Sequence, residues 1–365
     1  MTEINIRNME VADRKAVLRI MRRAFSVIQQ LFFSFSKNVL VAELNGKIQG
    51  AIVLKSFPLS DGVQGGVVKW VFTDPEVRGL GAGQQLIDSG LAWLEAAGCS
   101  QIFAIVEGFN TSSSKLFATR GFSILPFREQ LRRFGLIGVA RVWSASFHIL
   151  DIGHFLWGKP DTETSDKPTP QLVTTFVLNA LIAALAVWRA WDFHKPDPIA
   201  LLTLPLTFLI LIGLRTLAMM LVARAMKLDL RFRMWESGFN FCALIALAFG
   251  AFFPIPGGLY PNKNTWRYRE LIPLYGRIAL AGSSPALIVS WAAFLLLRFT
   301  SLTAWAAAVL SSVLEAAILF AIFDIVLFFF PFVSFNSRRL WDWHKGVWAL
   351  LTFAVVALIV LMRIF

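Results

Sequence analysis

A glycine-rich hexapeptide near residue 80 has the residue types and spacing of a phosphate-binding loop. Residues 78–83 read Arg-Gly-Leu-Gly-Ala-Gly, and they lie between an apolar run at 67–72 and a helix-like stretch at 84–97. Glycine allows a tight turn and brings backbone N–H groups close to an anion, and the positive end of the following helix points at the same anion. The sequence therefore predicts a strand, a loop that binds a phosphorylated ligand, and a helix.

Two common phosphate loops do not fit this hexapeptide. A Walker loop ends in Gly-Lys-Ser/Thr, whereas Gly83 is followed by Gln84. The dinucleotide fingerprint places its third glycine three positions after the second, whereas here the three glycines alternate. These two ligand classes are therefore excluded, and the open readings are a loop for a different phosphorylated ligand or an ordinary flexible loop.

The pattern Arg78-x-x-Gly81-x-Gly83 resembles the pyrophosphate loop of the GNAT superfamily of acetyltransferases. Downstream, a strand at 102–106, a helix opened by Asn110, and Phe117 before Gly121-Phe122 resemble the family's Asn…Tyr-x-x-x-Gly-Phe signature. The resemblance covers residues 1–158 and implies acetyl-CoA as co-substrate. It implies these cofactor-binding residues: Val71, Thr73, Arg78, Gly79, Leu80, Gly81, Ala82, Gly83 and Asn110.

The periodicity of this half independently predicts an α/β fold, a GNAT-like mixed sheet with flanking helices. Apolar residues recur at helical spacing over 11–25. Runs at 39–44 and 48–54 are β-like and are joined by Asn45-Gly46-Lys47, a hairpin signal. Strand and helix patterns then alternate, as in α/β domains.

The catalytic groups depart from the family in one place. The family often uses a tyrosine as general acid toward the thiolate, and Phe117 stands at that position. Glu107, at the end of a strand, is the predicted general base toward an ammonium acceptor. Two alternatives stay open: Glu107 is a solvated strand-end residue, or the domain binds acetyl-CoA without turnover.

The second half has the composition of a membrane domain. The mean hydropathy is +0.63 and 56% of residues are hydrophobic, which exceeds the range of ordinary soluble domains. A polar linker at 159–170 precedes apolar runs near 171–191, 198–223, 237–255, 276–297, 302–331 and 346–364. Most of these runs are long enough to cross a bilayer, so we expect an all-α polytopic domain over 171–365.

Basic residues determine the predicted topology. With six crossings and a cytoplasmic linker, the outer loops carry more lysine and arginine than the cytoplasmic loops, against the positive-inside rule. If 237–272 enters and returns on one side, only Arg189, Lys195, Arg298 and Arg363 remain outside. Prolines and glycines at 254–261 also oppose a regular spanning helix. The sequence thus predicts five crossings, one re-entrant segment at 237–272 and an external C-terminus.

Parts of the membrane half resemble site-2-protease-like metalloproteases. Residues 275–285 resemble their Ala-Gly-Pro helix, and 330–343 resemble their proline-rich loop that ends in Asp-Gly. Where that family has His-Glu-x-x-His, this chain has Arg215 and Met219, and Asn336 replaces the aspartate. Zinc requires imidazole, thiolate or carboxylate ligands. The resemblance therefore implies a reused scaffold, a pseudoprotease with no metal.

Three charges lie deep in apolar runs, namely Arg215, Glu315 and Asp324. Intramembrane charges are costly and usually face a partner or a polar cavity. The two acids are nine positions apart, so they face opposite sides of a helix and at most one of them pairs with Arg215. A structural ion pair and a cavity for an anionic or amine-bearing amphiphile both stay open. With Asn336, these residues are the membrane-domain candidates.

These observations together predict a membrane-bound N-acetyltransferase whose GNAT domain is cytoplasmic. Its expected partners are the lipid bilayer and an amine-bearing small molecule, lipid or protein. The alternative is a regulatory membrane protein that senses acetyl-CoA. The net charge is +12, but the basic residues flank the apolar spans, so nucleic-acid binding is a poor explanation. Residues 130–147 carry arginines beside apolar residues and predict an interfacial helix or packing against the last strand.

Overall fold

A computed structural model describes residues 4–77, 79–149, 151–160, 167–190, 198–262, 267–329 and 331–364. The chain divides into two compact units. The first comprises residues 1–106, 112–148 and 155–165, and the second comprises 107–111, 149–154 and 166–365. Segments 107–111 and 149–154 thus belong with the helical unit, although the sequence places them inside 1–158.

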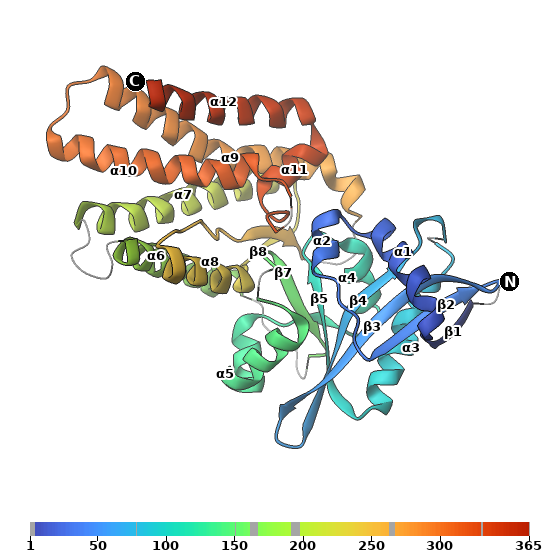
Figure 1. The fold of residues 1–365 in the computed structure, drawn as a ribbon. Helices are drawn as coiled ribbons and strands as arrows, with labels where there is room; N and C mark the ends of the chain where they lie inside the picture. The colour runs from blue at the N-terminus through green and yellow to red at the C-terminus, as the bar shows by residue number, and fades with distance from the viewer. Residues whose placement is uncertain are drawn as a thin grey trace. The chain divides into compact units, whose positions relative to one another are not determined.

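The first unit is built on a mixed seven-stranded sheet with the order β1-β2-β3-β4-β5-β7-β6 (Figure 1). The first four strands pair antiparallel, and β4 pairs parallel with β5. The strands are β1 (Ile4–Asn8), β2 (Asn38–Leu44), β3 (Lys47–Ser60), β4 (Val63–Thr73), β5 (Cys99–Glu107), β6 (Ser123–Ile124) and β7 (His154–Gly158). This confirms the predicted α/β class.

Local sequence explains the two hairpins of this sheet. Asn45 and Gly46, at φ 51° and 73°, form the two-residue turn between β2 and β3 that Asn-Gly favours. Gly62, at φ 73°, lies in the turn between β3 and β4. The long β3 and β4 therefore form a central hairpin that carries the glycine loop at the end of β4.

Helices flank the sheet and bury their apolar stripes. They are α1 (Arg14–Ala24), α2 (Val27–Leu31), α3 (Ala82–Ala96), α4 (Thr111–Ala118) and α5 (Phe127–Ser146), with short 3-10 turns at Val11–Asp13 and Pro75–Val77. In α1, Val17, Ile20 and Met21 pack in one cluster with β2 and β3. In α5, Trp143 is buried and donates to Gln130 at 2.8 Å, so this helix contributes to the packed interior.

The second unit is a bundle of helices with one small hairpin (Figure 1). Its elements are α6 (Pro168–Ala190), α7 (Pro198–Ala225), β8 (Leu230–Arg233), α8 (Glu236–Phe249), β9 (Gly258–Pro261), α9 (Tyr268–Phe299), α10 (Ala304–Ala321), a π-helix (Ile322–Val326), α11 (Asn336–Trp343) and α12 (Lys345–Ile364). Strands β8 and β9 pair antiparallel.

Five of these helices are long and apolar enough to cross a membrane. They are α6, α7, α9, α10 with its π-helical extension, and α12. Helix α8 is apolar but has only 14 residues, short of the roughly 20 that a crossing needs. Phe208, Ile212, Phe320 and Val355 belong to one buried apolar cluster in this unit. The predicted helical region, with apolar helices of spanning length, is therefore confirmed.

Candidate active site

The glycine loop follows β4 and leads directly into α3. Gly79 and Gly81 have φ of 91° and 87°, a left-handed conformation that strains any residue with a Cβ. Arg78 lies outside the described residues. Arg23 fixes the approach to the loop, since it donates to Asp74 at 2.9 Å and to Glu76 at 2.6 Å. Ion pairs with Arg23 thus hold the residues just before the turn, and the two glycines adopt the left-handed conformation of the turn itself.

The first turn of α3 offers backbone donors to an anion. Gly81 is the N-cap residue, and no side chain caps this helix within the described chain. A Cβ placed on Gly79 or Gly81 would meet nothing within 4 Å, so the loop backbone faces open space. The amides at Ala82 and Gly83 lie in the first turn of α3, where backbone N–H groups have no partner within the helix and can donate to an anion.

Strands β4 and β5 separate beside this loop. Their parallel pairing runs from Gln64–Cys99 to Val68–Ala104 and extends no further in the described residues. A bulge at Lys69 occurs at the same level, because Val53 faces Trp70 while Leu54 faces Val68. Val71 and Thr73 lie beyond this point, where the edge of β4 toward β5 can offer its backbone groups to a ligand.

The residue at the expected general-acid position is confined to the core. Phe117 in α4 is 2% exposed and its ring lies 5.5 Å from that of Phe122. Asn110 is exposed immediately before α4, and its backbone N–H donates to the Glu107 carbonyl at 2.9 Å. Phe117 therefore packs in the core and has no proton to donate to a thiolate.

Glu107, the last residue of β5, is half-buried within the second unit. Its Oε2 accepts from the Phe109 backbone N–H at 3.0 Å, and its Oε1 accepts from the Ser334 hydroxyl at 3.3 Å. Both contacts hold the carboxylate in place without a cationic partner among the described residues. A positioned carboxylate of this kind can accept a proton from an ammonium group.

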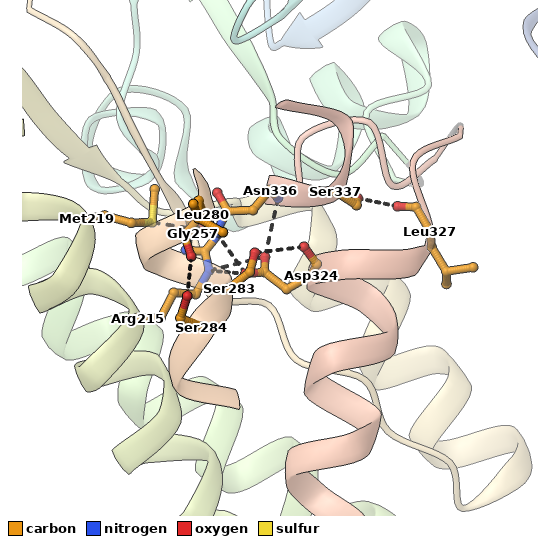
Figure 2. Close-up of polar contacts among 10 residues, drawn as sticks. All are labelled: Arg215, Met219, Gly257, Leu280, Ser283, Ser284, Asp324, Leu327, Asn336 and Ser337. Atoms are coloured by element: carbon orange, nitrogen blue, oxygen red, sulfur yellow. Dashed lines mark hydrogen bonds and ion pairs between the residues drawn. The ribbon is translucent and has the colours of Figure 1, made fainter. Parts of the chain in front are cut away.

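Three of the four membrane-domain candidates, Arg215, Asp324 and Asn336, meet in one buried polar network (Figure 2). Arg215 of α7 contacts Asp324 of the π-helix at 3.1 Å and donates to the Gly257 carbonyl at 3.0 Å. Asp324 also accepts from the Asn336 amide at 2.7 Å and the Ser283 hydroxyl at 3.2 Å. Asp324 is thus the partner of Arg215, and its satisfied network accounts for the burial of the pair.

Glu315 lies elsewhere in the same unit. It is exposed on α10 and borders an apolar cavity of about 290 Å³ between α6, α7 and α10. No ion pair of Glu315 occurs among the residues with described positions. The two acids therefore face different surroundings, as their spacing predicted.

Arg215, Met219 and Asn336, which stand where the resemblance would place metal ligands, are adjacent in space. The Asn336 amide lies 3.7 Å from the Met219 sulfur, and Arg215 shares Asp324 with Asn336. Within the described ranges, no group of three or more His, Cys, Asp or Glu side chains lies close enough to hold a metal ion. An arginine, a thioether and an amide do not form a zinc site.

Sequence reasoning missed one further cluster. All three tyrosines of the chain surround Phe109, with ring centroids at 4.7 Å (Tyr260), 5.8 Å (Tyr268) and 5.3 Å (Tyr275). The Arg339 guanidinium lies 3.7 Å from the Phe109 centroid. The scarcity of tyrosine in an aromatic-rich chain was the one available signal.

Residues 7–122 match the model of the Acetyltransferase (GNAT) family. Mycothiol acetyltransferase of Thermobispora bispora is 35% identical over 85 residues, which are 23% of this chain and 29% of that relative. The chain thus spans less than a third of the relative's length.

Two solved structures illustrate the likeness to known proteins. Arabidopsis thaliana Naa50 in complex with the bisubstrate analogue CoA-Ac-MVNAL has 15% identity and a TM-score of 0.32, over 43% of this chain and 98% of its own. The ribosomal-protein-S18-alanine N-acetyltransferase from Escherichia coli has 15% identity and a TM-score of 0.31, over 45% and 98%. Because the family match covers the residues that form the glycine loop and the separating strands, the N-terminal part of this chain carries a GNAT acetyltransferase domain.

Proposed function

We propose that this protein is a membrane-bound N-acetyltransferase that moves the acetyl group of acetyl-CoA to a primary amine at the cytoplasmic membrane face. The observation that carries the proposal is the loop at Gly79–Gly81, left-handed at both glycines and followed by an uncapped helix start. Backbone donors in this arrangement suit the pyrophosphate of CoA. The curated relative is named for an acetyl transfer, and we extend only that reaction class to this chain.

The proposed reaction breaks the thioester C–S bond and forms an amide C–N bond. The amine nitrogen attacks the thioester carbonyl, whose oxygen is polarised by backbone N–H groups of β4 beyond Val68. Glu107 takes the proton that the amine loses. CoA leaves as a thiolate and is protonated by water, because Phe117 has no proton to give. Proximity of the two bound reactants supplies much of the acceleration.

The second candidate is an acetyl-CoA sensor, and Phe117 is the observation that favours it. A domain without the usual acid can bind the cofactor and report its level through the membrane unit. We favour the enzyme because Glu107 is held by two hydrogen bonds at the end of β5. A fixed carboxylate is of no evident use to a sensor.

The membrane region is proposed to begin after a linker at 159–170 and to extend over 171–365, with 237–272 re-entrant and the C-terminus external. The juxtaposition of Arg215, Met219 and Asn336 supports the idea of a site-2-protease-like scaffold that has lost its metal ligands. In this proposal the network stabilises the bundle and the scaffold holds the acceptor near the bilayer.

The test uses the full chain in lipid nanodiscs with radiolabelled acetyl-CoA and a panel of primary amines. Time-dependent transfer of label to an amine, with one free CoA thiol released per transfer, is the expected result. Gly81→Val should abolish the transfer, while Gly62→Val, which places the same side chain at a left-handed glycine of another turn, should retain it. Tight CoA binding without transfer to any amine would favour the sensor.

A further inference from the structure

Arg339 is a buried cation whose hydrogen-bonding capacity is largely unused. It lies on α11 and is 5% exposed. Its Nη2 donates to the Val333 carbonyl at 2.5 Å, while Nε and Nη1 have no hydrogen-bond partner among the described residues. No carboxylate of the described chain forms an ion pair with it. Since a guanidinium stays charged and buried donors left unpaired are costly, this arrangement points to a missing anionic partner.

The surroundings of Arg339 stabilise its charge without consuming its donors. The guanidinium carbon lies 3.7 Å from the Phe109 centroid and 5.2 Å from that of Tyr268, and such aromatic faces attract cations. The neighbouring carboxylate, Asp342, is already engaged by the Tyr268 hydroxyl at 2.8 Å and by Arg338 at 2.9 Å. The aromatic cluster thus holds Arg339 in position and leaves the N–H groups of Nε and Nη1 available.

Arg339 borders a small cavity that is rich in donors. The cavity has a volume of about 10 Å³, which is the space that one water-sized atom occupies. No carboxylate lines it among the described residues. Six of its lining residues are Phe109, Arg215, Tyr275, Ser334, Asn336 and Arg339. The charge of Arg215 is balanced by Asp324. Among the described residues that line the cavity, Arg339 therefore supplies the unpaired positive charge, and the cavity fits one oxygen of an anionic group.

Ser334 connects this cavity to the proposed base. Its hydroxyl lines the cavity and donates to Glu107 Oε1 at 3.3 Å. The Glu107 carboxylate therefore contacts a residue that lines the same cavity as Arg339.

We propose that Arg339 binds an oxyanion of the acetyl acceptor, so the acceptor is a zwitterion with a primary amine and a phosphate or carboxylate. This inference rests on the proposed function, because it places the amine of that acceptor at Glu107. One oxygen of the anionic group enters the cavity and accepts from the free Arg339 N–H groups. The guanidinium thereby selects acceptors by charge, and Glu107 selects them by their ammonium group.

The first experiment measures the anion site without turnover. Thermal unfolding of the full chain in detergent is followed while inorganic phosphate is added at constant ionic strength. A ligand that binds only the folded protein raises the midpoint as its concentration rises. We expect this rise in the wild type and in Arg338→Gln, whose arginine lies on the same helix but is half-exposed and paired. We expect no rise in Arg339→Gln.

The second experiment measures acceptor choice. Phosphoethanolamine in solution and phosphatidylethanolamine in vesicles are compared with ethanolamine and octylamine, which lack an anion. A charge-assisted hydrogen bond predicts roughly a tenfold to hundredfold higher kcat/KM for the anionic acceptors. In Arg339→Gln that preference should disappear through KM, and Arg339→Lys should recover part of it. The ratio between phosphoethanolamine and phosphatidylethanolamine distinguishes a soluble acceptor from a lipid headgroup.

The outcomes separate the two proposals. Equal kcat/KM for anionic and uncharged amines in the wild type would overturn the inference and leave acetyl transfer intact. Phosphate stabilisation through Arg339 with no transfer to any amine would support the anion site and overturn the acceptor role. If Arg339→Gln does not fold, the inference is tested by the wild-type preference for anionic acceptors and by the same preference in Arg339→Lys. Neither measurement needs the Arg339→Gln protein.

Discussion

Replacing Arg215 with leucine should destabilise the helical unit by about 3 kcal/mol, the lower end of the range for removing one partner of a buried ion pair. The side chains of Arg215 and Asp324 are 2% and 0% exposed, so the remaining carboxylate cannot reach water. Ser283 and Asn336 still donate to Asp324 in the variant. Because hydrogen bonds to a charged group contribute about 1.5–3 kcal/mol, these two donors limit the loss.

The assay is thermal and denaturant unfolding of the full chain in detergent. A change of about 3 kcal/mol corresponds to more than a hundredfold shift in the folding equilibrium. Arg277→Leu is the matched control, since Arg277 is exposed on α9. Adding Asp324→Asn to Arg215→Leu should restore most of the stability, and the double-mutant cycle gives the coupling energy. An Arg215→Leu protein that is as stable as wild type but inactive toward its acceptor would refute this reasoning and assign Arg215 to ligand binding.

Further predictions concern the loop, the base, the topology and the metal. Gly81→Val should abolish CoA binding by calorimetry while Gly62→Val retains it, and unchanged affinity would give the loop another role. Glu107→Gln should lower turnover by roughly 10²-fold with acetyl-CoA affinity nearly unchanged, and equal turnover would remove Glu107 from the site. Single cysteines at Arg267 and Lys345 should react from the cytoplasmic side and one at Ile364 from outside, so external labelling at 267 would restore six crossings. Elemental analysis should find no stoichiometric zinc, and one zinc per chain would contradict the metal-free scaffold.

Sequence patterns were informative where the cause of the structure is local. Glycine readily adopts the left-handed conformation that a tight loop before a helix needs, and Gly79 and Gly81 adopt it. Asn45-Gly46 similarly specifies a hairpin, because both positions need positive φ. Apolar length alone was sufficient for the five candidate spans.

Contacts between distant segments were beyond this reasoning. Helical periodicity predicted that only one of Glu315 and Asp324 could face Arg215. Which of the two acids pairs with Arg215 depends on how α7 packs against α10 and its π-helical extension. The π-helix that presents Asp324 has no simple sequence signal. In the sequence, nothing distinguishes Arg339 from the other basic residues that flank the apolar runs. Its contact with Phe109 joins segments some 230 positions apart. Neither residue type nor spacing contains that information.

The assignment of residues 107–111 and 149–154 to the helical unit has a consequence for how the protein can be divided. The polypeptide contributes 107–111 and 149–154 to the helical unit before its long segment from 166 onward, so the two units alternate along the chain. Cutting at the linker would leave Phe109 without its tyrosines and Asp151 without Ser237, which donates to its carbonyl at 2.8 Å. We therefore expect calorimetry to show a single coupled melting event for the full chain. A GNAT domain and a membrane bundle that melt together would have to be inherited together, and could not be exchanged as modules among other proteins.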